Sequence, residues 1–288
     1  MIHSPQPASS GAALAGKVAI VTGGSRGFGL AVATALAAEG TKVALVARSM
    51  AVREAAEAIK AVDARVIALE ADITLPHAVA SVVEETVRRL GPVDLLVNNA
   101  GSAGALGPVW EVEPDAWWHD VTVNLRGTFL CARAVLPGMI ARREGRIINV
   151  ASLFGIQNSL GIEPSPYASG YSSSKAGVLI LTRHLAAMTR AYGIGVFGVS
   201  PGWMQTTLTD HMMRSKSGQR WLPEVESLYA AGRSGSPNGA VPLVMYLASG
   251  QADNLSGRCI RASYDVAAMA RNAENIRRED RFVLRFYE

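Results

Sequence analysis

A tyrosine and a lysine stand four residues apart in the segment Tyr171-Ser172-Ser173-Ser174-Lys175. If the segment is helical, the two side chains share one face at neighbouring turns. An isolated tyrosine has a pKa of about 10, which makes it a poor proton-transfer group at neutral pH. A fixed positive charge nearby favours the phenolate, so we expect Lys175 to lower the pKa of Tyr171 toward the working range. Such pairs also occur by chance on helix surfaces, and the spacing alone leaves both interpretations open.

The second chemically informative pattern is a glycine-rich turn in residues 18–29, which read VAIVTGGSRGFG. A short apolar run ends in three spaced glycines and passes directly into an alanine-rich helical pattern. Gly23 allows a sharp turn, Gly27 lets the backbone approach a diphosphate, and Gly29 lets helix and strand pack closely. The first N–H groups of the helix and its dipole then favour an anion. Because a strand and a helix flank the glycines, the pattern predicts a nucleotide-binding turn.

The elements that must position these residues alternate along the chain. After the first strand and a helix at 30–39, apolar runs predict strands at 42–47, 65–71, 93–98, 145–150, 195–199 and 257–261. Helical patterns lie at 51–62, 77–90, 115–143 and 171–192, and the third of these is expected to break or bend near Pro137. Strands that are apolar on both sides have helices on both faces. We therefore predict an α/β fold: a Rossmann-like, doubly wound parallel sheet in three α/β/α layers, forming a single domain.

Composition and charge argue against several other classes of protein. Of the 288 residues, 49% are hydrophobic and 18% are charged, so the chain can bury a substantial core. The net charge is +4 and the basic residues are dispersed, which disfavours nucleic-acid binding. Two cysteines make no disulfide framework, and no Cys/His spacing resembles a metal site, so we expect no metal. No apolar run approaches the roughly 20 residues of a membrane span, and residues 1–10 do not resemble a signal peptide, so we expect a cytoplasmic protein.

Six motifs together resemble those of the short-chain dehydrogenase/reductase family, over residues 17–261. Each is weak alone, but they occur in the family's order. Thr22-Gly23-x-x-x-Gly27-x-Gly29 is similar to the family's cofactor glycine motif, Asn98-Asn99-Ala100-Gly101 to its sheet-stabilising motif, Asn124 to its helix asparagine, Ser152 to its catalytic serine, Tyr171 and Lys175 to its catalytic pair, and Pro201-Gly202-x-x-x-Thr206 to its nicotinamide-side loop.

The resemblance implies a catalytic set of Asn124, Ser152, Tyr171 and Lys175. Ser152 would hydrogen-bond the substrate oxygen, and Tyr171 would donate a proton during reduction or remove one during oxidation. Lys175 would hold the ribose hydroxyls of the cofactor and lower the pKa of Tyr171, and Asn124 would anchor a water that links Lys175 to solvent. The implied function is an oxidoreductase that transfers a hydride between a nicotinamide cofactor and a carbonyl or secondary alcohol.

The end of the second predicted strand indicates which nicotinamide cofactor is used. An acidic residue there would bind the adenosine ribose of NAD and repel a 2′-phosphate. This chain instead has Ala47 followed by Arg48, and Arg26 in the glycine turn can approach the same region. Two guanidinium groups suit a phosphate monoester, so we predict NADP(H), with NAD(H) as the alternative. Together with the resemblance, this gives the expected cofactor contacts Gly23, Ser25, Arg26, Gly27, Phe28, Gly29, Arg48, Asp72, Ile73, Asn98, Ala100, Gly101, Tyr171, Lys175, Pro201, Gly202 and Thr206.

Large apolar side chains near the predicted site suggest the substrate. The candidates are Trp203, directly after Pro201-Gly202, and Trp221, with Met204, Met212 and Met213. Since ligand pockets are generally apolar with few polar anchors, we expect an apolar carbonyl or secondary alcohol. The expected substrate contacts are Ser152, Phe154, Tyr167 and Trp203. Ser152 and Tyr171 lie about six residues further apart than in the family pattern, and the extra length within 155–169 either shapes substrate entry or forms a surface loop.

We divide the chain into a flexible leader (1–15), an NADP-binding catalytic domain (16–264) and a C-terminal extension of the same domain (265–288). Residues 205–237 and the extension fall outside the strand–helix alternation, and 281–287 are strand-like. The expected partners are a small-molecule substrate and, by the resemblance, further copies of the chain in a homodimer or homotetramer, with neither nucleic acid nor membrane. Two alternatives stay open: a catalytically inactive NADP-sensing protein, and an enoyl reductase or epimerase on the same scaffold.

Overall fold

A seven-stranded parallel sheet forms the centre of the computed structural model, which describes residues 11–60, 65–154, 166–230 and 234–284. The order of the strands across the sheet is β3-β2-β1-β4-β5-β6-β7, so the chain reverses its direction of travel between β1 and β4. Doubly wound sheets bind ligands at such a switch point. The strands are β1 (Val18–Thr22), β2 (Lys42–Ala47), β3 (Val66–Glu70), β4 (Leu95–Asn98), β5 (Gly145–Val150), β6 (Ile194–Ser200) and β7 (Cys259–Arg261).

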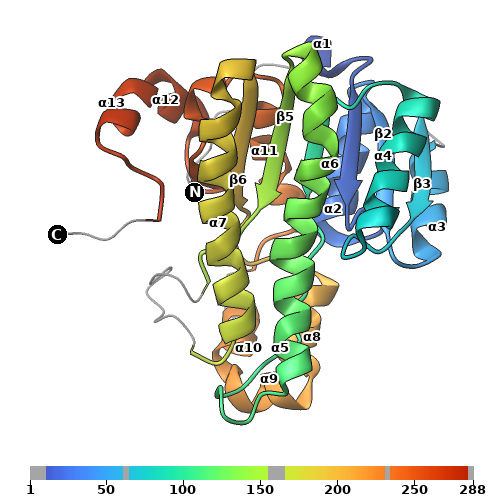
Figure 1. Ribbon diagram of the computed structural model, residues 1–288. Coiled ribbons are helices and arrows are strands. Elements are labelled where there is room, and N and C mark those ends of the chain that lie inside the picture. The colour runs from blue at the N-terminus through green and yellow to red at the C-terminus, as the bar shows by residue number, and fades with distance from the viewer. Residues whose placement is uncertain (1–10, 61–64, 155–165, 231–233, 285–288) are drawn as a thin grey trace.

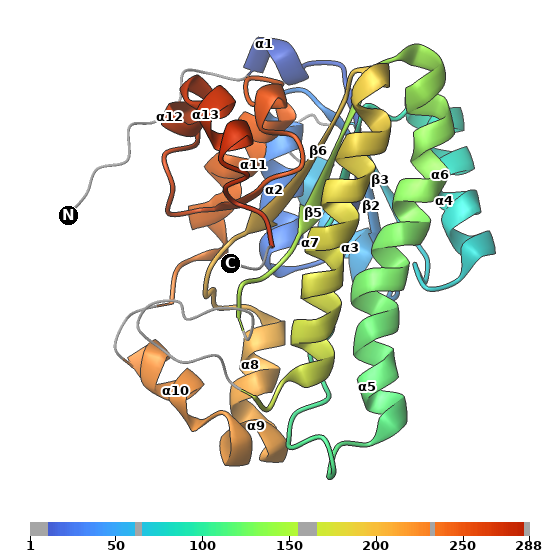
Figure 2. The same cartoon turned by 60° about the vertical axis from the view of Figure 1, so that its left-hand side comes forward.

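Helices cover both faces of this sheet, as Figures 1 and 2 show. One face packs against α2 (Gly27–Ala38), α3 (Ala51–Lys60) and α11 (Val241–Ala248). The other packs against α4 (Pro76–Leu90), α6 (Gly127–Arg142) and α7 (Ser169–Thr189). Successive residues of a strand point to opposite faces, so Val21 joins the first core and Ile20 the second. The predicted three-layer, Rossmann-like α/β/α fold is confirmed.

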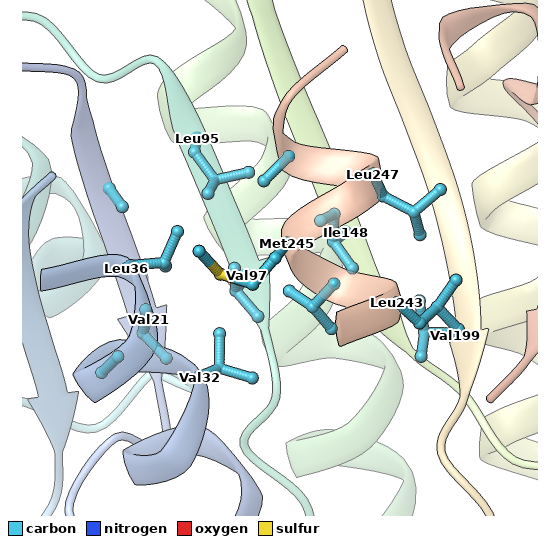
Figure 3. Close-up of a cluster of buried hydrophobic side chains, with 14 of the residues drawn as sticks. Val21, Val32, Leu36, Leu95, Val97, Ile148, Val199, Leu243, Met245 and Leu247 are labelled. Carbon is cyan, nitrogen blue, oxygen red and sulfur yellow. The ribbon is translucent and has the colours of Figure 1, made fainter. Parts of the chain in front are cut away.

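Close-packed aliphatic side chains fill the layer between the sheet and helices α2 and α11 (Figure 3). Val32 and Leu36 project from α2, and Leu243 and Leu247 from α11, toward the central strands. Each of the four is at most 5% exposed. Burial of a leucine or valine side chain stabilises the fold by about 2 kcal/mol, so this layer holds the strands firmly in register.

The predicted helix 115–143 is divided at a different place from the one expected. It consists of α5 (Pro114–Val121), a π-helical turn η1 (Thr122–Arg126) and α6. Pro137 lies inside α6, which continues through it without a break. The irregular turn instead contains Asn124, and π-helical turns are frequent at functional sites.

The segment after β6 departs from the alternation, as expected, and is helical. It contains α8 (Thr207–Arg214), α9 (Lys216–Trp221) and α10 (Pro223–Ala230), followed by a 3-10 turn η3 (Pro237–Ala240). Figure 2 shows these three helices beyond the carboxyl ends of the strands, below the sheet in that view. They therefore lie on the side of the molecule where the motif residues gather.

The N-terminal expectation needs a correction. Residues 11–14, assigned above to a flexible leader, form the short helix α1 (Gly11–Leu14). Leu14 is 3% exposed and packs in the first core, and its backbone oxygen accepts a hydrogen bond of 3.0 Å from Thr41 Oγ1. An apolar side chain and a backbone acceptor both find partners there. Residues 1–10 lie outside the described residues.

The C-terminal extension packs on the same domain. Its helices are α12 (Val266–Arg271) and α13 (Ala273–Arg278), and Met269 and Ile276 join the first core. Asp280 pairs with Arg183 at 2.8 Å and with Arg258 at 3.0 Å. The strand expected at 281–287 is not formed by residues 281–284, although the Cys259 N–H donates to the Phe282 backbone oxygen at 2.8 Å. Residues 285–287 of that expectation lie outside the described residues.

Within the described ranges, no helix has both the length and the apolar character needed to cross a membrane. Across those same residues, His, Cys, Asp and Glu side chains form no group of three or more that could bind a metal ion. Cys131 and Cys259 are both free, and burial raises the pKa of each thiol to about 12. Neither thiol is therefore a nucleophile at neutral pH.

Candidate active site

A cavity of about 900 Å³ opens at the carboxyl ends of the strands. Its wall runs from Arg48, after β2, to Arg261, at the end of β7, and passes the glycine turn on the way. Most of the predicted cofactor, catalytic and substrate residues line it: Gly23, Ser25, Arg26, Gly27, Phe28, Arg48, Asp72, Ile73, Ala100, Gly101, Ser152, Phe154, Tyr171, Lys175, Pro201, Gly202, Trp203 and Thr206.

The glycine turn forms a cradle that larger side chains would fill. Gly23 and Gly27 have φ angles of +63° and +56°, in the left-handed region that favours glycine. A Cβ atom on Gly23 would lie 2.9 Å from the Ala100 Cα atom, and one on Gly29 would collide with the Gly23 backbone oxygen. Helix α2 begins at Gly27, and its cap residue Arg26 contributes no side-chain hydrogen bond to the first N–H groups. The open cradle and helix start fit the diphosphate of a dinucleotide.

Gly29 itself lies behind the cradle, outside the cavity wall. It permits close packing between α2 and the end of β1, which is the packing role predicted for it. Direct cofactor contact by Gly29, also predicted, finds no support in this arrangement, because Gly23 and Asn99 stand nearest to it.

Thr22 and Asn99 tie the glycine turn to the end of β4. Thr22 Oγ1 accepts hydrogen bonds from the Asn99 and Ala100 N–H groups, at 3.0 and 3.1 Å. The Asn99 amide donates back to the Thr22 and Gly23 backbone oxygens, at 3.0 and 3.1 Å. These four bonds hold two loops from different strands together, so both side chains are structural ties.

Asn98 is placed differently from the prediction that it lines the adenosine side. It is 3% exposed, and its amide donates to Asn149 Oδ1 at 2.9 Å. Asn149 in turn donates to Thr182 Oγ1 of α7 at 2.9 Å. Asn98 and Asn149 are register partners on β4 and β5, which brings their side chains together under α7 instead of at the strand ends. Asn98 therefore ties β4 to β5, Asn149 ties β5 to α7, and the cavity wall does not include Asn98.

Basic and acidic groups meet at the end of the cavity near β2 and β3. Arg26 and Arg48 are both exposed cavity residues, and in the described part of the chain neither forms a salt bridge. Asp72 accepts a hydrogen bond of 2.9 Å from the Thr74 N–H. Burial alone would raise the pKa of Asp72, but the Thr74 hydrogen bonds and the charges of Arg48 and His119 outweigh it and hold that pKa below its usual value. This end carries a positive field with one ionised carboxylate.

Ser152, Tyr171 and Lys175 converge at the end of β5. Tyr171 and Lys175 occupy one face of α7, as the spacing predicts, and both are buried, at 9% and 5% exposure. The Tyr171 hydroxyl and the Ser152 side chain are hydrogen-bonded to each other. Lys175 Nζ donates to the Val150 backbone oxygen at 2.7 Å and lies 5.8 Å from the centre of the Tyr171 ring. A hydroxyl pair and an ammonium group thus face one cavity.

The balance of charge and burial in this site differs from the expectation. Burial is the largest influence on Tyr171 and raises its pKa above 10, against the hydrogen bond with Ser152, which lowers it. Burial also lowers the pKa of Lys175 from 10.5 to about 8. The predicted lowering of the Tyr171 pKa by Lys175 is therefore not the dominant effect, since an enclosed site penalises the phenolate. At neutral pH the phenol is therefore protonated.

Asn124 supports the cavity from behind. Its Oδ1 accepts from the Ser102 N–H at 2.8 Å, and its amide donates to the Ser102 backbone oxygen at 2.8 Å and to Ser174 Oγ at 2.9 Å. A Cβ atom on Gly101 would lie 3.2 Å from Asn124 Oδ1 and 3.8 Å from Lys175 Nζ. Asn124 thus lies close to Lys175, with a side chain occupied by structural bonds. Its role as a water anchor stays a prediction.

Aromatic rings line the side of the cavity next to Tyr171. The Phe154 ring meets Trp203 edge-on, with centroids 5.0 Å apart, and lies 6.4 Å from the Tyr171 ring. Tyr167, a predicted substrate contact, instead packs on Trp221 with centroids 4.9 Å apart and is not in the cavity wall. Residues 155–165, most of the predicted insertion, lie outside the described residues.

Several cavity residues belong to none of the motifs. Ala103 and Gly104 follow the β4 loop, Leu208 and His211 come from α8, and Arg261 ends β7. Helix α8 is amphipathic, but its apolar face could pack on a core as readily as line a pocket. The sequence therefore carried no separate signal for these positions.

Comparison with known proteins identifies the family. A model described as short chain dehydrogenase matches residues 17–217. The chain belongs to the short-chain dehydrogenase/reductase family. It is 35% identical to an NAD(+)-dependent 2-dehydro-3-deoxy-L-rhamnonate dehydrogenase of a Sphingomonas species, over 82% of this chain and 89% of that protein. It is 33% identical to a 3-oxoacyl-[acyl-carrier-protein] reductase of Vibrio cholerae, over 87% and 97%.

A similar solved structure supports the assignment to this family. It is described as a putative NAD(P)-dependent gluconate 5-dehydrogenase from Beutenbergia cavernae with bound NADP. Its TM-score is 0.75, at 32% identity, covering 86% of this chain and 96% of that one. The chain is accordingly an oxidoreductase of this family that acts on CH–OH or C=O groups with a nicotinamide cofactor.

Proposed function

We propose that this short-chain dehydrogenase/reductase uses NADP(H) to reduce an apolar ketone, with Tyr171 as the proton donor. The observation that carries the proposal is the hydrogen-bonded Ser152–Tyr171 pair beside an aromatic wall, in a cavity whose far end holds Arg26 and Arg48.

The residues of the cavity fit the cofactor. When bound, NADP(H) supplies or accepts the hydride. The glycine cradle and the first turn of α2 would hold the diphosphate, and Arg26 and Arg48 would bind the 2′-phosphate. Asp72 would meet the adenine amino group, Thr206 the carboxamide, and Lys175 the ribose hydroxyls. No carboxylate follows β2 to repel a phosphate, because Ala47 is succeeded by Arg48.

The chain's own residues supply proton transfer and orientation. Ser152 would donate a hydrogen bond to the carbonyl oxygen of the substrate and place it next to the Tyr171 hydroxyl. Tyr171 would then pass its proton to the oxygen as negative charge develops there. Because burial raises the pKa of Tyr171, the proton is in place at neutral pH, which suits reduction. Oxidation of the alcohol would need the phenolate and therefore a higher pH.

The aromatic wall next to Tyr171 indicates the substrate class. Phe154 and Trp203 form an edge-to-face pair, and Leu208 and Met212 add aliphatic surface. Aromatic walls of this kind bind apolar or ring-containing molecules and gain about 1 kcal/mol from ring geometry beyond burial. A ketone flanked by apolar groups satisfies the site, since only its carbonyl oxygen needs a polar partner.

A homo-oligomer and a cytoplasmic location complete the proposal. Large apolar side chains stand exposed on α5, α6 and α7: Trp118, Phe129, Ile180 and Met188 are 60%, 45%, 39% and 61% exposed. Apolar side chains at this density on neighbouring helices favour a contact with another copy of the chain. Analytical ultracentrifugation of the wild-type chain and of Phe129→Glu tests this, and a monomeric wild-type protein would contradict it.

Oxidation of NADPH and of NADH, each followed at 340 nm against a panel of ketones, aldehydes and quinones, tests the function. We expect turnover with apolar ketones and a preference for NADPH of at least about tenfold in kcat/KM. Ser152→Ala tests whether the turnover comes from this site, because its rate should fall about 100-fold or more. Binding of NADPH without turnover across the panel would favour the alternative of an inactive NADP-sensing protein.

A further inference from the structure

Asp120 is a buried acidic residue beside the active site that no motif identifies. It lies on α5 with 0% exposure. Its carboxylate accepts three hydrogen bonds: from Ser102 Oγ at 2.6 Å, from the Gly104 N–H at 3.0 Å and from the Ala105 N–H at 3.0 Å. Among the residues that the structure describes, it has no salt-bridge partner. Three donors and no cation suit an ionised carboxylate held by dipoles.

All three donors belong to one segment, residues 102–105, which follows β4. Ser102, Ala103 and Gly104 of this segment line the cavity. Asn124, one helical turn after Asp120, binds both the N–H and the backbone oxygen of Ser102. The α5–η1 helix therefore holds this stretch of cavity wall at two successive turns. Without Asp120, two N–H groups and a hydroxyl would lose their acceptor, and the Ala105 N–H would lose it in a buried place.

The carboxylate also acts on the proton donor. Ser152, from the loop after β5, hydrogen-bonds the Tyr171 hydroxyl, and Lys175 of the same helix lies 5.8 Å from the Tyr171 ring centre. The charge of Asp120 on α5 also acts on Tyr171, and His211 of α8 lines the same cavity. Of these, the negative charge of Asp120 opposes formation of the phenolate and raises the pKa of Tyr171. Charges act over longer distances in an enclosed site than in water, because the medium screens them less.

We propose that Asp120 is a positioning residue that fixes the 102–105 wall of the cavity and adds a negative charge that opposes formation of the Tyr171 phenolate, so that alcohol oxidation needs a higher pH than it would without this charge. The proposal rests on the proposed function for its last clause. Its electrostatic part concerns the free protein and can be measured without turnover.

The test compares Asp120→Asn with Ser102→Ala. Asparagine keeps the size of the side chain and an acceptor oxygen for Ser102 and Gly104, but removes the charge and the acceptor of the Ala105 N–H. Ser102→Ala removes one of the same hydrogen bonds and leaves the charge in place. The first readout is titration of tyrosine absorbance at 295 nm, with the curve of the matching Tyr171→Phe protein subtracted to isolate one of the seven tyrosines.

We expect Asp120→Asn to lower the titration midpoint of Tyr171 by about one pH unit, and Ser102→Ala to leave it unchanged. The pH at which alcohol oxidation reaches half its maximal rate should fall by the same amount. An unchanged midpoint in folded Asp120→Asn, or an equal shift in both variants, would overturn the proposal. If Asp120→Asn does not fold, Asp120→Ser provides the neutral variant, with a hydroxyl as acceptor.

The two proposals fail in distinguishable ways. A shifted absorbance midpoint with no reaction on any carbonyl would leave the placement of Asp120 intact and contradict the proposed function. Carbonyl reduction by the wild-type protein, with an unshifted Tyr171 midpoint in Asp120→Asn, would support the proposed function and contradict the role of Asp120.

Discussion

Lys175 is anchored to the strand that precedes Ser152: its Nζ atom donates to the Val150 backbone oxygen at 2.7 Å. The bond holds the ammonium group at the end of β5, two residues before Ser152, and at 5.8 Å from the Tyr171 ring centre. Helix α7 and strand β5 are therefore held together close to the hydrogen-bonded Ser152 and Tyr171. This arrangement places a charged amine in a buried site, which lowers the free energy of unfolding by an amount that can be measured.

Replacing Lys175 with methionine should stabilise the protein while removing its activity. Burial lowers the pKa of Lys175 to about 8, so the folded state carries the full cost of the buried charge below that pH. We expect Lys175→Met to raise the free energy of unfolding by about 1–3 kcal/mol at pH 7, after allowing for the lost hydrogen bond. Urea unfolding measures this, with exposed Lys216→Met as the control.

The pH dependence of that difference follows from proton binding. Between pH 8 and 10.5 the unfolded chain binds the lysine proton and the folded protein does not, so wild-type stability rises with pH in this window. The advantage of Lys175→Met should therefore shrink across it. A difference that stays constant from pH 7 to 10.5 would contradict the burial of a charged lysine.

The two arginines at the adenosine end should determine cofactor choice. Arg48→Ala and Arg26→Ala should each lower kcat/KM for NADPH by about tenfold or more, because each removes a charge-assisted contact to phosphate. The value for NADH should change little. Arg53→Ala, an exposed arginine of α3 outside the cavity wall, is the matched control. Equal losses with both cofactors would show that these side chains do not read the 2′-phosphate.

Asn98 should matter for stability and not for cofactor binding. Its amide donates to Asn149 inside the protein, so Asn98→Ala leaves a buried acceptor without its donor. We expect a loss of about 1–3 kcal/mol in the free energy of unfolding, with an unchanged Kd for NADPH. Asn238→Ala, at an exposed position, should change neither. A weaker Kd with unaltered stability would restore the original prediction of cofactor contact.

The aromatic wall should govern kcat/KM for the ketone. Phe154→Ala removes the ring between Trp203 and Tyr171 and should lower kcat/KM for apolar ketones by about tenfold to 100-fold. Trp110→Ala is the control, since Trp110 is 85% exposed and lies outside the cavity. Similar rates on small charged oxo-acids and on apolar ketones would argue against this substrate class.

Much of the fold was predictable because its signals are local. Apolar runs mark strands covered on both faces, and the glycines at 23, 27 and 29 mark a turn that only small residues fit. The motif residues also converge as expected, because parallel strands end at one edge of the sheet. Ser152 and the glycine cradle reach the cavity for this reason, and Tyr171 reaches it from the first turn of α7.

What the sequence could not show depends on tertiary context. Whether Asn98 faces a cofactor or a neighbouring asparagine is decided by the register of β4 against β5. The pKa of Tyr171 depends on how completely the site is enclosed, and spacing along a helix does not report that. Asp120 resembles any polar residue of a surface helix until residues 102–105 fold over it.

The most direct test of the whole account is the rate of NADPH-dependent ketone reduction by Tyr171→Phe, measured beside its Kd for NADPH. Phenylalanine keeps the ring and its packing but has no proton to donate. We predict a kcat about 1,000-fold below that of the wild-type protein, with a Kd within about threefold of it. A Tyr171→Phe protein that reduces the ketone at the wild-type rate would contradict the central claim that this phenol is the proton donor.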